Sequence, residues 1–273
     1  FYSWEDSVGD NESSPLYQSV KAFQTLYSRH GVTDNFLKVA AYRQHNWREP
    51  SAETLVTQNF RRAAHLARYA GLKGIALDLE PHVKNFWTAD PAIPDKAERV
   101  YRLGREVGQA IKSAYPGATV IVIPEILAFT CPPYAAQVCQ AYHLSSQFLG
   151  GLIQAHFEHL ILGTENSYNS ARPDVIATKT RPFYDPFLAR NGLAPAALSI
   201  APGLWPLGKS YTDKRARITP VQFQERLQLA MDGKPPYVWI YGLGNTWKEK
   251  GGPMEPRFEE YMRVIHQAEK QCN

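Results

Sequence analysis

Long apolar runs, clustered charge and cysteine are all scarce in this sequence, and each absence excludes a class of protein. No stretch of about 18 apolar residues occurs, so we expect no membrane-spanning helix. Lysine and arginine are dispersed apart from a short cluster within residues 209–217, and the net charge is only +4. Because nucleic-acid-binding proteins concentrate basic residues on one face, we expect no nucleic-acid partner. No Gly-x-Ser-x-Gly sequence occurs, which leaves Ser-His-Asp catalysis with little support.

The cysteines and histidines predict no metal site. Only three cysteines are present, and their spacing matches no ligand pattern. Cys131 and Cys139 flank a predicted loop and either form a disulfide or stay unpaired, which leaves Cys272 near the end of the chain. His45 and His82 have no second ligand at helical spacing. We therefore expect neither a metal ion nor a cofactor.

Two features of the sequence bear on location. The chain begins at Phe1 instead of Met, and Asn11-Glu12-Ser13 is a glycosylation sequon. From these features we expect a processed protein that is secreted, exposed on the cell surface or periplasmic.

Apolar runs of strand length alternate with longer amphipathic runs along most of the chain, which indicates βα repetition and an α/β fold. The predicted strands are residues 37–42, 74–80, 119–125, 160–165, 198–203 and 237–242. The predicted helices are residues 52–70, 96–115, 145–158, 175–190, 220–232 and 256–270. A single (β/α)8 TIM-like barrel domain over residues 1–273 fits this order, because such barrels have about 250 residues.

The strand count predicts an irregular start to the barrel. If residues 237–242 form the eighth strand, counting backwards makes residues 74–80 the fourth and residues 37–42 the third. Only Phe1–Trp4 then resembles a strand in the preceding part of the chain. We therefore expect a first strand that is incomplete or irregular.

Four acids end successive strands of this predicted barrel. Asp78 and Glu80 are two residues apart on one strand, so both carboxylates project from the same face. Glu125 and Glu165 end the next two strands, and the carboxyl ends of barrel strands meet at the rim where catalysis takes place. Acids at strand ends also cap helices or pair with arginine, and this structural role is the alternative for each of them.

Neighbouring carboxylates of this kind can hydrolyse glycosidic bonds. They raise one another's proton affinity, and an apolar wall such as Trp87 or Trp239 raises it further, so that one acid stays protonated. This acid donates its proton to the leaving oxygen while another carboxylate acts as base, nucleophile or orienting group. The acid pair therefore predicts a glycosidase that acts on a polysaccharide or an oligosaccharide.

The segment that carries the pair, Lys-Gly-Ile-Ala-Leu-Asp-Leu-Glu-Pro, resembles the fourth-strand motif Asp-Gly-x-Asp-x-Asp-x-Glu of the chitinase-like glycoside hydrolases of family 18. Gly74, Asp78 and Glu80 match the motif, whereas Lys73 and Ala76 stand where it has acids. The resemblance implies a TIM-like barrel in which Glu80 is the general acid. It also implies that Asp78 orients a substrate acetamido group that attacks the sugar carbon.

A mechanism without substrate assistance needs a second carboxylate. Many barrel glycosidases place their nucleophile on the seventh strand, but residues 198–203 contain no acid, which disfavours that arrangement. Glu165 and then Glu125 are the remaining partners of Glu80. A separation of about 5 Å would indicate retention of configuration at the sugar carbon, and one of about 6.5 to 9.5 Å would indicate inversion.

Aromatic and polar residues that follow the strands are candidates for binding a sugar, since aromatic faces stack on sugar rings and polar groups hydrogen-bond to hydroxyls. Trp205 and Trp247 are the main candidates for stacking, and Trp239 is a further candidate for the floor of a sugar site. Each of these residues has ordinary packing as its alternative. The full set of predicted binding residues is Tyr42, His82, Asn166, Tyr168, Trp205, Trp239, Tyr241 and Trp247.

Three functional hypotheses follow from these residues. The first is a glycosidase with Glu80 as proton donor and a carbohydrate as substrate. The second is a chitinase-like lectin that binds sugars without turnover, which the missing acids at positions 73 and 76 favour. The third is a metal-assisted hydrolase that uses Asp78, Glu80, Glu165 and a histidine on the same rim.

Overall fold

The computed structural model describes residues 9–40, 49–80, 87–124, 143–165, 167–168, 170–207, 218–241 and 257–272. The chain divides into two compact units. Unit 1 comprises Phe1–Leu162 and Phe183–Ser199, and unit 2 comprises Gly163–Pro182 and Ile200–Asn273. The expectation of a single barrel domain stays a prediction, and each unit is described by itself below.

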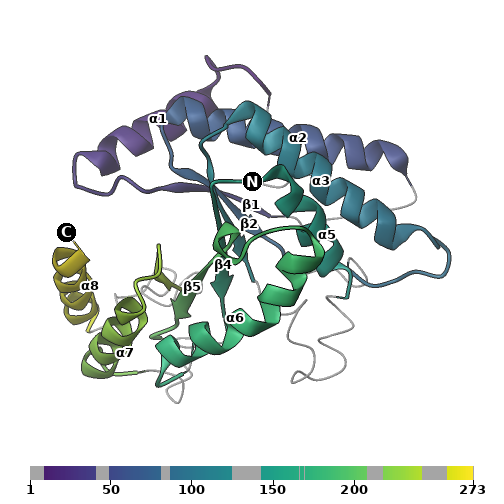
Figure 1. Ribbon diagram of the computed structural model, residues 1–273. Helices are drawn as coiled ribbons and strands as arrows, with labels where there is room; N and C mark the ends of the chain where they lie inside the picture. Colours follow the sequence, from purple (N-terminus) through teal and green to yellow (C-terminus); the bar gives the residue numbers. More distant parts are fainter. Residues whose placement is uncertain are drawn as a thin grey trace. The chain divides into compact units, whose positions relative to one another are not determined.

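Unit 1 is built from alternating helices and strands (Figure 1). Its elements are α1 (Pro15–Ser28), β1 (Phe36–Ala40), α2 (Pro50–Ala70), β2 (Gly74–Asp78), α3 (Lys96–Ala114), β3 (Thr119–Ile123), α5 (Ser145–Leu152), the 3-10 helix η2 (Ile153–Ala155) and the 3-10 helix η3 (Pro195–Ala197). Strand β4 (His159–Thr164) and helix α6 (Pro173–Arg190) contribute residues to both units.

Strands β1 to β4 form a parallel sheet in chain order, and on one face of this sheet all the paired residues are apolar. The register places Val39 opposite Leu77, Leu77 opposite Val122 and Val122 opposite Leu162. All four side chains are at most 1% exposed. Helix α2 packs on β1 and β2 and is flanked by α1 and α3. The buried face therefore contributes to the hydrophobic core of unit 1, and the opposite face carries the polar residues Lys38 and Asp78 beside apolar ones.

The helix boundaries follow local sequence signals. Helix α2 ends at Gly71, which has a φ of 74° and closes the helix in the left-handed conformation. Helix α1 was not expected from the sequence, although Ser14 caps it by accepting a hydrogen bond from the backbone N–H of Tyr17. Tyr17 is fully buried and packs against Leu66 of α2.

Helices α3 and α5 approach each other through glycine. A methyl group on Gly104 of α3 would lie 2.0 Å from the carbonyl oxygen of Phe148. A methyl group on Gly151 of α5 would lie 2.0 Å from the carbonyl oxygen of Tyr101. Because no side chain fits between the two backbones, glycine is required at both positions.

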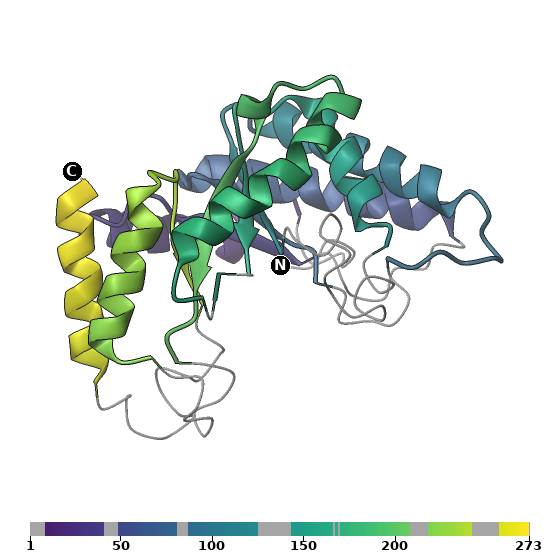
Figure 2. The same ribbon diagram turned by 60° about the horizontal axis from the view of Figure 1, so that its bottom comes forward.

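Unit 2 contains β5 (Ser199–Leu204) except its first residue, α7 (Pro220–Asp232), β6 (Trp239–Ile240) and α8 (Phe258–Cys272). Strands β5 and β6 are parallel, with Gly203 opposite Trp239. Helix α7 begins with a capping box between Thr219 and Gln222, and it lies beside α8 (Figure 2). Buried side chains from β5, α7 and α8 form one hydrophobic cluster, comprising Leu204, Leu207, Ile218, Phe223, Leu227, Tyr261 and Val264.

The α/β fold is confirmed, and each of the six strands and six helices predicted from residue 37 onwards has a counterpart. Two of them are shorter than predicted: strand 237–242 is reduced to Trp239–Ile240, and helix 145–158 ends at Leu152 and is followed by η2. The described residues contain six strands, so a closed eight-stranded barrel is not shown. Phe1–Trp4, the candidate for an irregular first strand, lies outside the described residues. None of the described helices combines the length and apolar character that crossing a membrane requires.

Candidate functional site

The acid pair of unit 1 lies at the carboxyl end of β2, as predicted. Asp78 is the last residue of the strand and is only 5% exposed, whereas Glu80 is half-buried. One carboxylate oxygen of Asp78, Oδ1, accepts a hydrogen bond of 3.1 Å from the backbone N–H of Glu80. The other oxygen, Oδ2, lies 2.7 Å from Nζ of Lys38. Both oxygens of Asp78 are therefore engaged, and its side chain is held in one orientation.

Lys38 is a site residue that the sequence reasoning missed. It lies on β1 opposite Ala76, the position where the family 18 motif has an acid. The Lys38 side chain is 67% exposed and reaches the buried Asp78 carboxylate from the neighbouring strand. The alternation of side chains along residues 36–40 could have placed Lys38 on this face, but only the strand register shows its partner.

Trp87 supports the backbone just before Glu80. Its indole N–H donates a hydrogen bond of 2.8 Å to the carbonyl oxygen of Leu79, and the side chain is 1% exposed. The ring packs against Phe148, with the ring centres 5.5 Å apart. Trp87 was expected to form an apolar wall beside the acid pair. In the structure it is buried and hydrogen-bonded to the backbone at the end of β2.

Lys96, the first residue of α3, is buried and bonds to the backbone next to Trp87. It is 3% exposed, and its Nζ donates a hydrogen bond of 2.7 Å to the carbonyl oxygen of Thr88. Burial lowers the pKa of Lys96 below its ordinary value of 10.5, and the nearby charge of Asp90 acts in the opposite direction. Burying an ammonium group costs free energy unless it is hydrogen-bonded, and the Thr88 carbonyl provides such a bond.

Unit 2 brings four predicted aromatic residues together, and we call them the aromatic cluster: Tyr168, Trp205, Trp239 and Tyr241. The rings of Tyr168 and Tyr241 are stacked at 5.4 Å. Trp205 packs edge-on against Tyr241 at 5.1 Å, and the centre of the Trp239 ring lies 5.0 Å from that of Tyr168. The hydroxyl of Tyr168 lies 3.3 Å from Oε1 of Glu165, so this predicted acid borders the cluster.

Gly203 of β5 contacts Trp239 of the aromatic cluster and is hydrogen-bonded to Ser167. The hydroxyl of Ser167 donates a hydrogen bond to the Gly203 carbonyl and accepts one from the Gly203 N–H, both at 2.8 Å. A methyl group on Gly203 would lie 2.7 Å from the carbonyl oxygen of Thr164 and 2.7 Å from Nε1 of Trp239. Only glycine therefore allows the Trp239 ring to lie against the strand backbone. Neither Gly203 nor Ser167 was predicted as a site residue.

The aromatic cluster contains two buried donors without acceptors. In the part of the chain that the structure describes, Nε1 of Trp205 and Nε1 of Trp239 are buried and have no hydrogen-bond partner. Buried polar groups of proteins are nearly always paired with protein or water. The two tryptophans thus differ from Trp87, whose indole N–H is satisfied.

Exposure separates the possible roles of the cluster residues. Tyr168 is 7% and Trp205 is 9% exposed, so little of either ring is open for stacking on a sugar. Trp239 and Tyr241 are half-buried and have more of their surface available. If the cluster stacks on a sugar, these two rings are the ones that can do so.

Several predicted site residues cannot be placed. Glu125, Tyr42, His82, Asn166 and Trp247 lie outside the described residues, as does the possible disulfide. Glu165 belongs to unit 2 and the acid pair to unit 1. The carboxylate separation that would distinguish retention from inversion therefore stays a prediction.

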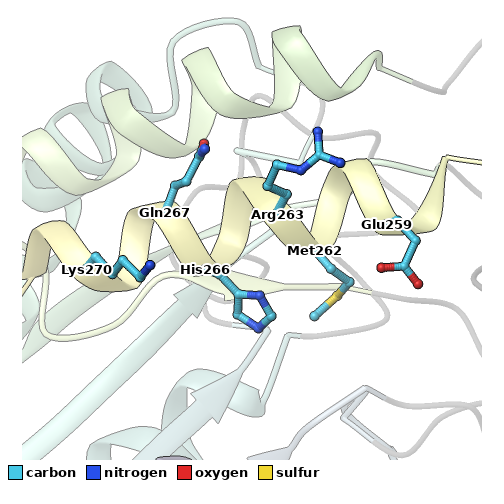
Figure 3. A pocket seen from close by; sticks show the side chains of 6 residues that line it. All are labelled: Glu259, Met262, Arg263, His266, Gln267 and Lys270. Atoms are coloured by element: carbon cyan, nitrogen blue, oxygen red, sulfur yellow. The ribbon is translucent and has the colours of Figure 1, made fainter.

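A separate pocket of about 310 Å³ lies on α8, and Figure 3 shows that all its labelled side chains come from this one helix. It contains none of the predicted site residues, and its lining comprises Glu259, Met262, Arg263, His266, Gln267 and Lys270. Among the residues with described positions, no group of three or more His, Cys, Asp or Glu side chains is placed to hold a metal ion.

Comparison with known proteins supports the fold. No family model matches the sequence, and no curated protein matches it either. Among solved structures, a chitinase from Bacteroides thetaiotaomicron aligns with a TM-score of 0.52 and 10% identity, over 93% of this chain and 82% of that one. This likeness agrees with an α/β fold of the TIM-like kind.

Two further solved structures align less well. They are a β-1,4-mannanase from the sea hare Aplysia kurodai, with 12% identity over 94% of this chain and 73% of that one, and a sugar phosphate isomerase/epimerase from Parabacteroides distasonis, with 11% identity over 91% and 77%. Both have TM-scores of 0.48.

Proposed function

We propose that this protein is a glycoside hydrolase in which Glu80 is the general acid. The observation that carries the proposal is the acid pair at the carboxyl end of a parallel strand, with Asp78 buried and bonded to the backbone N–H of Glu80. Active sites of α/β barrels lie at this end of the strands. The fold shared with a chitinase is consistent with this chemistry.

In the proposed reaction, Glu80 donates its proton to the glycosidic oxygen as the bond between that oxygen and the sugar carbon breaks. Water then supplies a hydroxyl group to the sugar carbon, and its proton returns to a carboxylate. Asp78 is suited to orienting the substrate, because Lys38 and the Glu80 N–H hold its two oxygens in place. Glu165 and Glu125 are the proposed partners if the substrate itself does not assist.

Replacement of one oxygen by nitrogen tests this assignment. Glu80→Gln keeps the shape of the side chain but removes the proton donor, and we expect the rate of sugar release to fall by about 100-fold or more. Glu98→Gln, at an exposed position of α3, is the matched control and should keep wild-type activity. The assay is mass spectrometry of the products from a panel of glycans. Wild-type activity in Glu80→Gln would refute the assignment.

The second candidate is a lectin that binds sugar without cleaving it. The ion pair between Lys38 and Asp78 favours this reading, because a lysine partner replaces the acid that the motif carries at position 76. The same glycan panel separates the candidates. Binding of a glycan without release of sugar by the wild-type protein would identify a lectin.

A further inference from the structure

We infer that the aromatic cluster of unit 2 binds an uncharged sugar unit through the indole N–H groups of Trp205 and Trp239. This inference rests on the proposed carbohydrate function and deepens it, because it names the class of sugar and the groups that recognise it. It assigns the two tryptophans a hydrogen-bonding role in place of a role as stacking surfaces alone.

The two donors lie in one small region of unit 2. Trp205 and Trp239 both pack against Tyr168, at 5.4 and 5.0 Å between ring centres. Both also pack against Tyr241, at 5.1 and 6.0 Å. The two indoles therefore flank the same stacked pair of tyrosine rings. The inference therefore requires a ligand with several oxygen atoms, one for each indole N–H group.

The unpaired state of these donors points to a ligand. Burying an N–H group without an acceptor is unfavourable, and the described part of the chain has two such groups in this one cluster. Gly203 allows the Trp239 indole nitrogen to lie against the β5 backbone, where a methyl group would come within 2.7 Å of it. Strand β5 thus leaves space for the Trp239 N–H group but provides no hydrogen-bond acceptor for it. We infer that an oxygen atom of a bound ligand is the acceptor for this N–H group.

The neighbouring acid determines the charge of the ligand. Oε1 of Glu165 lies 3.3 Å from the hydroxyl of Tyr168, so a carboxylate borders the cluster. A carboxylate accepts hydrogen bonds from sugar hydroxyls and repels anionic groups. Indole N–H groups donate to hydroxyl, ether and carbonyl oxygens alike. The combination suits a neutral, hydroxyl-rich ring better than a uronic acid or a sulfated sugar.

The test uses substitutions that remove each N–H and keep an aromatic face. We expect the wild-type protein to bind at least one of cellotetraose, mannotetraose and chitotetraose in isothermal titration calorimetry, and to bind tetragalacturonate at least about tenfold more weakly. Trp205→Phe and Trp239→Phe should each weaken the neutral sugar by about fivefold to tenfold, since each loses one hydrogen bond.

Tyr261→Phe is the matched control, because it also removes one polar group from unit 2. Its hydroxyl bonds to the carbonyl oxygen of Ile218 within the hydrophobic cluster, so sugar affinity should stay at the wild-type value. Circular dichroism of each variant confirms that it is folded.

Three outcomes overturn the inference: no binding of any of the three neutral sugars, equal or tighter binding of tetragalacturonate, or wild-type affinity in both tryptophan variants. Sugar release by the wild-type protein is measured separately. Binding that depends on the indole N–H groups, without any release of sugar, would support the inference and reject the proposed hydrolase.

Discussion

Gly203 offers a sharp test of how the aromatic cluster is built. In Gly203→Ala the new methyl group would lie 2.7 Å from the Thr164 carbonyl oxygen and 2.7 Å from Nε1 of Trp239. Ordinary contacts between such atoms are about 3.5 Å or longer, so the strand or the ring must move by close to 1 Å. The movement would also stretch the two hydrogen bonds of 2.8 Å between Ser167 and the Gly203 backbone.

The size of the effect follows from these contacts. Overpacking of a close-packed site costs about 1 to 3 kcal/mol, and a weakened hydrogen bond adds about 1 kcal/mol. We therefore expect Gly203→Ala to lower the free energy of unfolding by about 2 to 4 kcal/mol. The emission of Trp239 should shift as well, because its ring leaves the strand backbone.

Urea denaturation followed by far-ultraviolet circular dichroism measures the loss of stability, and tryptophan fluorescence reports the movement of the ring. Gly233→Ala is the matched control: no atom lies within 4 Å of its new methyl group, and its φ of −72° suits alanine. The control should change stability by less than about 1 kcal/mol, in the stabilising direction. If Gly203→Ala unfolds at the same urea concentration as the control, Trp239 and Thr164 do not approach Gly203 as closely as described.

Three further substitutions test the acid pair and its support. Lys38→Met should reduce sugar release by freeing the Asp78 carboxylate but should leave thermal stability nearly unchanged, because Lys38 is mostly exposed; Lys38→Arg should restore activity. Trp87→Phe removes the hydrogen bond to Leu79 and leaves a gap, so the free energy of unfolding should fall by about 2 kcal/mol in urea denaturation. Burial lowers the pKa of Lys96, so its charged form destabilises the fold at neutral pH, and this cost disappears as the pH rises through the lowered pKa to 10.5. The stability of the wild type should therefore increase with pH in the alkaline range more steeply than that of Lys96→Met; parallel pH profiles would contradict this reasoning.

The strand and helix pattern could be predicted because each element carries a local signal. The strand at Gly74–Asp78 and the helix at Pro220–Asp232 lie where an apolar run and an amphipathic run indicated them. Helix α1 was missed because its buried face carries polar residues: Tyr17 and Gln24 are its buried positions, and neither stands out in an apolar count. A Ser-Pro pair at its start was the available signal.

Features of the site that depend on neighbouring strands could not be predicted. The partner of Asp78 is fixed by the register that places Lys38 opposite Ala76, and sequence patterns do not determine a register between strands so far apart in the chain. The indole N–H of Trp87 is bonded and that of Trp205 is not, although both residues look alike in the sequence. Such differences depend on the tertiary environment of each ring.

The glycine contact between α3 and α5 limits how unit 1 can be altered. Where two helices meet through side chains, a substitution is absorbed by a change of rotamer in its neighbours. At Gly104 and Gly151 the neighbouring atoms are peptide carbonyls, which have no such freedom. Protein engineers who wish to improve this protein should leave the crossing untouched and seek gains on the outer surfaces of the helices.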